Sequence, residues 1–559
     1  MFPSFRPPRG LTAWICVALL YAPASAAAGA SSGPSAARPV GGTFRRMLGA
    51  NPLTLDPAMA SDMYGSAVMR QLFTGLVSFD LHLRPRPALA EFWESSRDGR
   101  TWTFTLRRGV VFHHGREVTA QDVVYSLTRL LAAPKRPPRA VLFQYLQGAQ
   151  AFLQGHTTQV SGLQVLERYK VRLVLHEPLT PFLLLWGLTC PCVVPQEEVE
   201  RQGAHFGRAP VGTGPFKFVR WHPDQEIVLE AHPAYYEGRP WLDRVVFQIA
   251  VGARLEDTLA AFLQGHLEET MIPSGKLDEV RRSPQYQPYQ HVYKPMLSLL
   301  YLGFNTRVKP FDDRRVRQAF NYAVNKVKIV QEITGMGHLP AVGALFPGLA
   351  GYDPTLEGYA YNPAKARALL AEAGYPAGTG FPVVQLWSSQ QAASTRAELA
   401  AYQRDLAAIG VQVELHFAPD WPAFAALLDQ GALAMFRLIW IADMPDADNI
   451  LSLLLHSASA TNRMFYQNPR VDQLLEQARR ERDEAQRSVA YRKVERLVMQ
   501  DAPWITQSYA SVYYLYQPYV RGVELSLLGK REIPLHKIWF DHRPAVQGPQ
   551  GRGDAARQR

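Results

Sequence analysis

The middle of the chain carries a series of amphipathic helices, which alternate with extended segments. Apolar residues recur at helical spacing behind Asp313, and a second helical pattern runs from Asn362 to a glycine at 374. A third covers residues 396–409, and residues 411–417 then alternate apolar and polar side chains as a strand does. Because such helices each pack one face on a sheet, the sequence predicts an α/β fold.

The two ends of this helical region are richer in strand patterns. Alternation predicts strands at residues 102–108, 168–175 and 216–221, and Thr119 with Asp122 predicts the start of a helix. Residues 471–498 fit a long helix or a helix pair, and residues 504–519 are again strand-like and aromatic. The length of 559 residues fits three or four domains, or one large interlocked architecture.

The first 28 residues have the pattern of a secretory signal peptide. Arg6 and Arg9 precede an apolar run at residues 11–21, and a stretch of small residues follows at 22–28. The run is about half the length that spans a bilayer. Cys16 lacks the preceding small residues of a bacterial lipoprotein signal, so no lipid anchor is evident. We expect removal of residues 1–28, a linker at 29–40 and a periplasmic location.

The formal net charge is +11, which raises the question of a nucleic-acid partner. About half of that charge lies in the signal peptide and in residues 542–559, a Gly, Pro and Gln-rich tail that we expect to be disordered. Lys and Arg elsewhere are dispersed among Asp and Glu, so the sequence argues against nucleic-acid binding.

Two cysteines, Cys190 and Cys192, remain after removal of the leader. They are two apart, and in a strand such residues point to opposite faces, which strains a disulfide between them. Two states of this pair remain as alternatives: two buried, unpaired thiols, or a labile disulfide.

The sequence contains no H-E-x-x-H zinc motif, no G-x-S-x-G nucleophile elbow and no phosphate-binding P-loop. The run from His113 to Glu117 resembles a metal motif, but adjacent histidines cannot share a helical face, so a turn is expected there. The histidines are scattered without ligand spacing. We therefore expect that the protein is not an enzyme and that it holds no cofactor and no metal ion.

Charged and aromatic residues gather between positions 420 and 443. Asp420, Trp421, Arg437, Trp440 and Asp443 suit a ligand that carries both an ammonium and a carboxylate. An aspartate accepts charge-assisted hydrogen bonds from the ammonium, and an arginine binds the carboxylate with two parallel bonds. The alternative is a solvated surface segment whose tryptophans help to fill the core.

Several motifs in a fixed order resemble one known family. They are T-L-D-P at 54–57, R-Q-L-F-T-G-L at 70–76, W-T-F-T-L-R-R-G-V at 102–110, F-H-H-G at 112–115, T-A-Q-D-V-V-Y-S at 119–126, G-T-G-P-F at 212–216, H-P-A-Y-Y at 232–236, F-N-T at 304–306, D-R-R-V-R-Q-A at 313–319 and A-E-A-G-Y at 371–375. The chain thus resembles extracytoplasmic solute-binding protein family 5 of ABC importers, whose members bind oligopeptides, dipeptides or nickel chelates.

The resemblance implies a two-lobed type II periplasmic-binding-protein fold with an extra subdomain and a two-strand hinge. The first lobe would comprise residues 41–293, with the extra subdomain at about 66–205, and a return segment at 511–541. The second lobe would comprise residues 294–510. The hinge crossings are expected near residues 294–303 and 508–513. The protein would work as a monomer, close on a peptide or other small solute, and deliver it to a permease and ATPase complex.

The resemblance also implies site residues. Trp440 and Asp443 match the residues that anchor a peptide's α-ammonium, and Trp421 matches a side-chain pocket. Arg437 is a candidate for the terminal carboxylate of a short peptide, and Tyr509 for a pocket aromatic. In the first lobe, the loop at Ser61, Asp62 and Met63 would present main-chain groups to the ligand. No metal or cofactor is implied for the peptide-binding branch.

This sequence departs from the family pattern at several positions, among which Ile439 replaces a glycine directly before the site tryptophan. The added side chain would reshape the pocket. A nickel chelate or another non-peptide solute is the alternative ligand. A secreted hydrolase and a chaperone-like protein are the alternatives outside transport. Ligand identity, peptide length, affinity and the cognate permease are left open.

Overall fold

The computed structural model describes residues 38–59, 62–81, 83–133, 143–187, 191–334, 337–442, 444–527, 529 and 533–541. The chain divides into two units, Met1–Arg38 and Pro39–Arg559, and every element below belongs to the second. The predicted signal peptide at 1–28 and tail at 542–559 lie outside the described residues. Within the described ranges, no helix has the length and hydropathy needed to cross a bilayer.

The largest sheet has seven strands and mixes parallel with antiparallel pairing. Its order is β11 (Glu269–Met271), β17 (Trp504–Tyr516), β12 (Gln290–Phe304), β16 (Met435–Ile441), β14 (Val384–Ser388) and β15 (Val413–Phe417), with β13 (Leu339–Pro340) paired to β17. Strand β14 runs parallel to β15 and β16, whereas β12 runs antiparallel to β16 and β17. The predicted α/β character is confirmed.

The helices predicted from N-cap residues and apolar spacing form at the predicted positions. Helix α7 (Arg314–Ala323) begins at Asp313, whose side chain accepts a hydrogen bond from the Arg315 N–H. Helix α9 (Pro363–Glu372) begins at Asn362, whose side chain accepts from the Lys365 N–H. Helix α10 (Ala393–Ala407) overlaps the third predicted helix, 396–409, starting three residues earlier and ending two residues earlier. The segment 471–498, predicted as a long helix or a helix pair, forms two helices, α13 (Pro469–Arg480) and α14 (Glu484–Asp501).

Two four-stranded sheets lie in the range predicted as the first lobe. One has the order β1 (Thr43–Leu48), β10 (Arg244–Ile249), β9 (Glu226–Ala231) and β8 (Phe216–His222). The other, in the predicted extra subdomain, has the order β4 (Ala90–Ser95), β5 (Thr101–Leu106), β7 (Lys170–Val174) and β6 (Leu163–Glu167). Helix α2 (Ala120–Ala132) begins after Thr119 as predicted, and the Asp122 side chain accepts a hydrogen bond from the Thr119 N–H at 2.8 Å.

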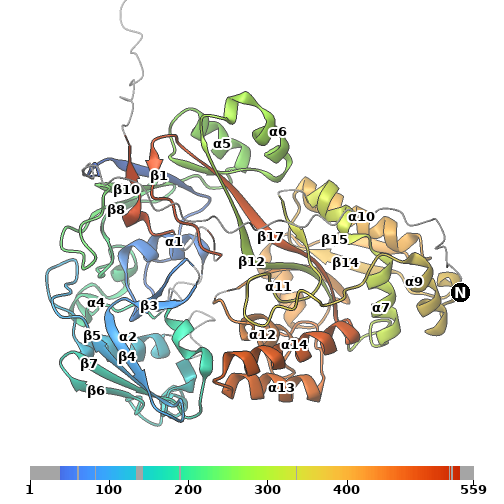
Figure 1. The fold of residues 1–559 in the computed structure, drawn as a ribbon, viewed down its shortest axis with the longest axis horizontal. Coiled ribbons are helices and arrows are strands. Elements are labelled where there is room, and N and C mark those ends of the chain that lie inside the picture. The colour runs from blue at the N-terminus through green and yellow to red at the C-terminus, as the bar shows by residue number, and fades with distance from the viewer. Residues whose placement is uncertain are drawn as a thin grey trace, which may run out of the picture. The chain divides into compact units, whose positions relative to one another are not determined.

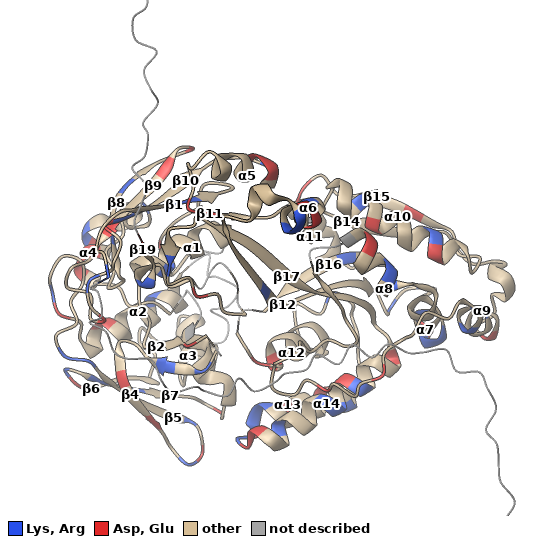
Figure 2. Ribbon diagram, turned by 45° about the horizontal axis from the view of Figure 1, so that its top comes forward, with Lys and Arg blue, Asp and Glu red and all other residues tan. Residues whose placement is uncertain are grey.

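The smaller elements complete these layers. They are α1 (Met63–Leu72), the hairpin of β2 (Val77–Phe79) and β3 (Pro85–Pro87), α3 (Ala149–Leu153), α4 (Gln196–Gln202), α5 (Leu255–Leu263), α6 (Leu277–Arg282), α8 (Lys326–Lys328), α11 (Trp421–Asp429), α12 (Asp448–Leu455), and β18 (Val520–Arg521) with β19 (Trp539–Phe540). In the view of Figure 2, Lys and Arg alternate with Asp and Glu along α13 and α14, as expected from dispersed charge.

Strands β12 and β17 form a long antiparallel pair, the ribbon, whose side chains belong to two different apolar clusters (Figure 1). Lys294 lies opposite Val512, and after an irregularity in register Leu299 lies opposite Tyr509. Val512 belongs to a buried cluster with residues of β1 and β10, whereas Leu299 and Tyr509 belong to a different cluster. Both predicted hinge crossings, near 294–303 and 508–513, lie on this ribbon. The predicted limits of the two lobes stay a prediction. We keep the names first lobe and second lobe for those ranges.

Candidate ligand-binding site

Strand β16 carries two of the predicted site residues and presents them on opposite faces. Side chains alternate along a strand, so Leu438 and Trp440 share one face and Arg437 and Ile439 share the other. Trp440 lies opposite Leu299 on β12, which in turn lies opposite Tyr509 on β17. Residues directly opposite one another in a sheet point to the same face, so Trp440 and Tyr509 belong to one row on one face.

The second half of β16 has a strand on only one side among the described residues. Strand β14 pairs with Met435 and Phe436 alone, whereas β12 pairs along the whole length of β16. From residue 438 onward, the edge turned away from β12 therefore has no described strand beside it. Such an edge is the place where an extended peptide adds as a strand.

Trp440 is half-buried beside this open edge. Its ring packs on the apolar cluster that contains Leu299 and Tyr509, and its indole N–H donates to the Asn449 side-chain oxygen at 3.4 Å. The exposed part of the ring offers an apolar surface to a ligand. Asp443, the predicted ammonium anchor, lies outside the described residues, so its pairing with Trp440 stays a prediction.

Arg437 is buried and already balanced by a carboxylate. Its Nε and Nη2 donate to the two oxygens of Glu398 on α10 at 2.8 and 3.1 Å, and its Nη1 donates to Gln390 at 2.9 Å. Both members of the ion pair are almost fully shielded from solvent. This arrangement joins α10 to the sheet, and the predicted carboxylate-binding role of Arg437 stays a prediction.

Tyr509 is 4% exposed and lies in the core. Its hydroxyl donates to the Gly343 carbonyl at 3.1 Å and accepts from the Gly343 N–H at 3.3 Å. Burial raises the pKa of this hydroxyl far above its usual value. Tyr509 thus holds the segment around Gly343 against the sheet, and its role in a ligand pocket stays a prediction.

Trp421 and the predicted main-chain site of the first lobe both lie at helix starts. Trp421 is the first residue of α11, is 52% exposed and has its ring 6.0 Å from that of Phe424. Asp62 caps α1 by accepting from the Gly65 N–H at 2.6 Å, and Met63, 58% exposed, is the first residue of that helix. The structure therefore has a helix start where a loop was expected. Ser61 lies outside the described residues.

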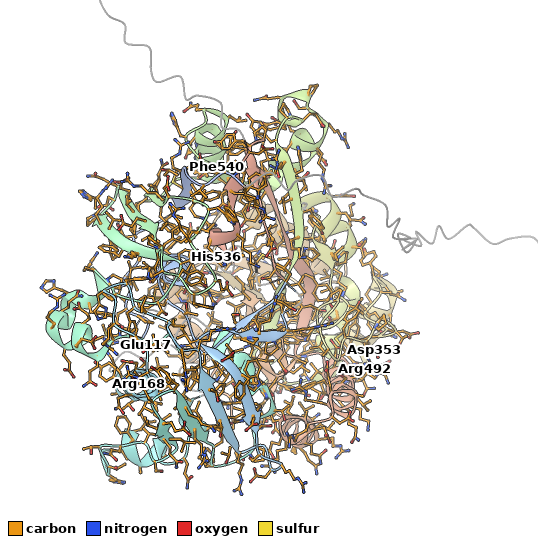
Figure 3. The ribbon with its side chains drawn as sticks, turned by 60° about the vertical axis from the view of Figure 1, so that its left-hand side comes forward. Glu117, Arg168, Asp353, Arg492, His536 and Phe540 are labelled. Carbon is orange, nitrogen blue, oxygen red and sulfur yellow. The ribbon has the colours of Figure 1, made fainter. Side chains whose placement is uncertain are left out.

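The run from His113 to Glu117 forms the predicted turn. His113 is partly buried with its Nε2 3.1 Å from the Gly214 carbonyl oxygen, and desolvation lowers its pKa to about 3. His114 pairs with Glu197 at 2.9 Å. Glu117 pairs with Arg168 at 3.4 Å, and Figure 3 labels these two residues close to each other. Among the described residues, no group of three or more His, Cys, Asp or Glu is arranged to hold a metal ion. Cys192 is buried, and Cys190 is not described.

A cavity of about 760 Å³ was not predicted from the sequence. It is lined by the β2–β3 hairpin, by Arg107, by residues 235–237 and by parts of the return segment between 524 and 537. These segments are far apart along the chain, and none carries a spacing signal that would have brought them together. The hairpin residue Leu83 lines this cavity.

Comparison with known proteins gives a consistent result. The profile of "Bacterial extracellular solute-binding proteins, family 5 Middle" matches residues 84–462. The chain is 28% identical over 509 residues to Di/tripeptide-binding protein 2 of Pseudomonas aeruginosa, with 88% of this chain and 93% of the relative covered. It is 30% identical over 467 residues to the glutathione-binding protein GsiB of Pectobacterium atrosepticum, with 82% and 87% covered.

Solved structures agree with the fold. The periplasmic binding protein DppA from Helicobacter pylori in complex with the peptide STSA matches with a TM-score of 0.74 and 25% identity, covering 90% of this chain and 99% of that one. The Escherichia coli murein tripeptide binding protein MppA matches with a TM-score of 0.75 and 24% identity, covering 89% and 99%. These matches confirm the predicted two-lobed periplasmic-binding-protein fold.

Proposed function

This chain belongs to family 5 of the bacterial extracellular solute-binding proteins, and from that premise we propose that it captures short peptides for an ABC importer. The observation that carries the proposal is the open edge of β16 beside Trp440, on a strand that is hydrogen-bonded to the ribbon between the lobes. Similarity to a di/tripeptide-binding relative over nearly its whole length supports the same ligand class.

Each part of the site has a chemical task in this proposal. The peptide lies extended along residues 438–441 and hydrogen-bonds to the main-chain groups on the edge turned away from β12, while the Trp440 ring covers one of its faces. Asp443 accepts charge-assisted hydrogen bonds from the α-ammonium, each worth about 1.5–3 kcal/mol when shielded from water. Waters bridge the side chains of the ligand in the remaining space, which permits varied sequences.

The wider proposal concerns location and partners. The leader at 1–28 directs the protein to the periplasm and is removed. One copy of the mature chain closes its two lobes on the peptide by bending at the β12–β17 ribbon, as periplasmic binding proteins generally do. The closed form then docks on a membrane permease that is coupled to an ATPase. The protein binds its ligand without chemical change.

Calorimetric titration with a defined panel tests the proposal. The panel contains di- and tripeptides, glutathione, the same peptides with an acetylated N-terminus, and a nickel chelate. We expect the free peptides to bind, mass spectrometry to recover them intact, and acetylation to weaken binding by about tenfold or more, because it removes the ammonium charge. Cleaved peptides, or binding of the nickel chelate alone, would contradict the proposal.

A further inference from the structure

Two turns that are distant in the sequence meet in the structure. One joins α13 to α14 at residues 481–483 in the second lobe, and the other joins β4 to β5 in the extra subdomain of the first lobe. Arg482 makes three hydrogen bonds across this contact. Its acceptors are the Ser95 hydroxyl at 3.2 Å and the carbonyls of Ser96 and Arg97 at 3.3 and 2.5 Å. A single side chain thus joins the two lobes.

Two further contacts join the same regions. The Thr180 hydroxyl, in the extra subdomain, donates to the Glu481 carbonyl at 3.0 Å. Arg480, the last residue of α13, pairs with Glu177 at 3.6 Å. The second lobe therefore contributes three consecutive residues, 480–482, and the extra subdomain meets them with two separate segments.

Internal hydrogen bonds fix the shape of each turn. In the second lobe, the Glu481 side chain accepts from the Asp483 N–H at 2.8 Å, and Asp483 in turn caps α14. In the first lobe, the Ser96 carbonyl accepts from the Gly99 N–H at 3.0 Å, and the Ser96 hydroxyl accepts from the Thr101 N–H at 2.9 Å. Since neither turn has to be ordered by the contact, little conformational entropy is lost when the two come together.

An apolar contact accompanies this polar one. Met444, in the second lobe, is 2% exposed and belongs to the apolar cluster of the extra subdomain, which includes Phe143 and Trp186. Arg482, by contrast, is exposed, and its hydrogen bonds lie at the surface. When the lobes separate, water replaces the acceptors of Arg482, so these hydrogen bonds break at a modest cost. The contact is therefore suited to form and break repeatedly.

We propose that Arg482 is a positioning residue that holds the two lobes closed around a bound peptide. The inference rests on the proposed function, in which closure traps the ligand. None of the contacting residues belongs to the β12–β17 ribbon, so bending there breaks this contact without breaking a strand. Because the contact exists only while the lobes are together, it slows the release of the peptide and leaves its capture unchanged.

Stopped-flow fluorescence of the full mature protein with trialanine measures capture and release separately. Arg482→Ala removes all three hydrogen bonds, whereas Arg482→Lys keeps the charge without the planar fork that reaches several acceptors. Thr180→Val removes the neighbouring hydrogen bond from the other lobe at similar size. Arg470→Ala is the matched control, because Arg470 is an exposed arginine of α13 whose Nη1 donates to Gln473 on the same helix at 2.6 Å.

We expect Arg482→Ala to raise the dissociation rate constant of trialanine about five- to tenfold, the worth of one or two hydrogen bonds. Thr180→Val should raise it about threefold, and Arg482→Lys should lie between Arg482→Ala and the native protein. The association rate constant, and the melting temperature of the ligand-free protein, should match the native values in all these variants. Arg470→Ala should match the native protein in every measurement.

Release at the native rate in both Arg482→Ala and Thr180→Val overturns the inference. Slower capture by Arg482→Ala, together with a lower melting temperature of its ligand-free form, also overturns it, since the arginine would then support the fold instead of closure. In either case, normal binding by the native protein leaves the proposed function intact. If the native protein binds no peptide of the panel, trialanine included, the proposed function itself fails and the role in closure fails with it.

Discussion

The two halves of β16 have different neighbours, although they belong to one short strand. Met435 and Phe436 have strands on both sides, and Arg437 beyond them is paired with the buried Glu398. In the second half, Ile439 is 38% exposed, Trp440 is half-buried, and β12 is the one strand described beside it. The first half therefore holds the sheet and α10 together, and the second half is available to a ligand.

Removal of Glu398 should have the largest effect. Glu398→Ala leaves the Arg437 charge buried without its partner, which costs about 3–5 kcal/mol in the free energy of unfolding, measured by urea titration. The double variant Glu398→Leu with Arg437→Met should recover most of that loss, because no buried charge remains. A loss below about 1 kcal/mol for the single variant would show that the first half of β16 does not depend on this pair.

Replacement of Asp443 should affect binding instead of stability. Asp443→Asn keeps the shape and removes the charge, so the affinity for dipeptides should fall by about ten- to a hundredfold in calorimetry, the worth of one charge-assisted bond. The melting temperature should stay within about 2 °C. Asp278, an exposed aspartate on α6 outside the proposed site, is replaced in the same way as the matched control for lost charge. Equal affinities for Asp443→Asn and the native protein would contradict the ammonium anchor.

A buried glutamate near Tyr509 predicts that the stability of the fold depends on pH. Glu495 on α14 is 2% exposed and accepts from the Leu345 N–H at 2.8 Å, close to the Gly343 that Tyr509 holds. Burial raises the pKa of its carboxyl to about 7 from 4.5, although the backbone hydrogen bonds oppose the shift. The folded state keeps this proton to higher pH than the unfolded chain does. The contribution of Glu495 to stability is therefore full below pH 4.5 and lost as the pH rises to about 7.

Glu495→Gln should remove this dependence while keeping the acceptor for Leu345. The slope of unfolding free energy against pH, measured between pH 4.5 and 7, should become flatter by up to one proton. Glu484→Gln, at an exposed position on the same helix, should leave the slope unchanged. An identical slope in Glu495→Gln and the native protein would contradict the assignment.

Substitution of Ile439 should have the smallest effect. Its side chain lies on the face of Arg437, opposite the face of Trp440, so Ile439→Ala should change peptide affinity by less than about threefold. Calorimetry on the same peptide panel measures this. A change above about tenfold would place Ile439 in the pocket, as its departure from the family pattern first indicated.

Local signals allowed much of the fold to be predicted. The side chains of Asp313 and Asn362 accept hydrogen bonds from backbone N–H groups two and three residues ahead, and the Asp122 side chain accepts from the Thr119 N–H. The signals that start these helices therefore lie within short segments. Strands β5 and β15 follow from alternation for the same reason. The two-lobed arrangement came from resemblance, since no local rule specifies which strands of distant segments pair.

The electrostatics and the contacts between lobes were not predictable in this way. Glu398 lies 39 residues before Arg437, and no spacing rule for a helix or hairpin joins them. Leu83 has a left-handed φ of 61°, which contradicts the preference for glycine there, and only its burial in the core of the second lobe explains it. Strained positions and buried ion pairs depend on residues that only the folded chain brings together, and strained positions are concentrated at functional sites.

The central claim is that a peptide binds along the open half of β16. Hydrogen exchange of the protein with and without a saturating tripeptide, read by mass spectrometry, tests it directly. We predict that the amides of residues 438–441 become protected, while those of Met435 and Phe436, which already lie between two strands, do not change. Protection elsewhere with none at residues 438–441 would contradict the account.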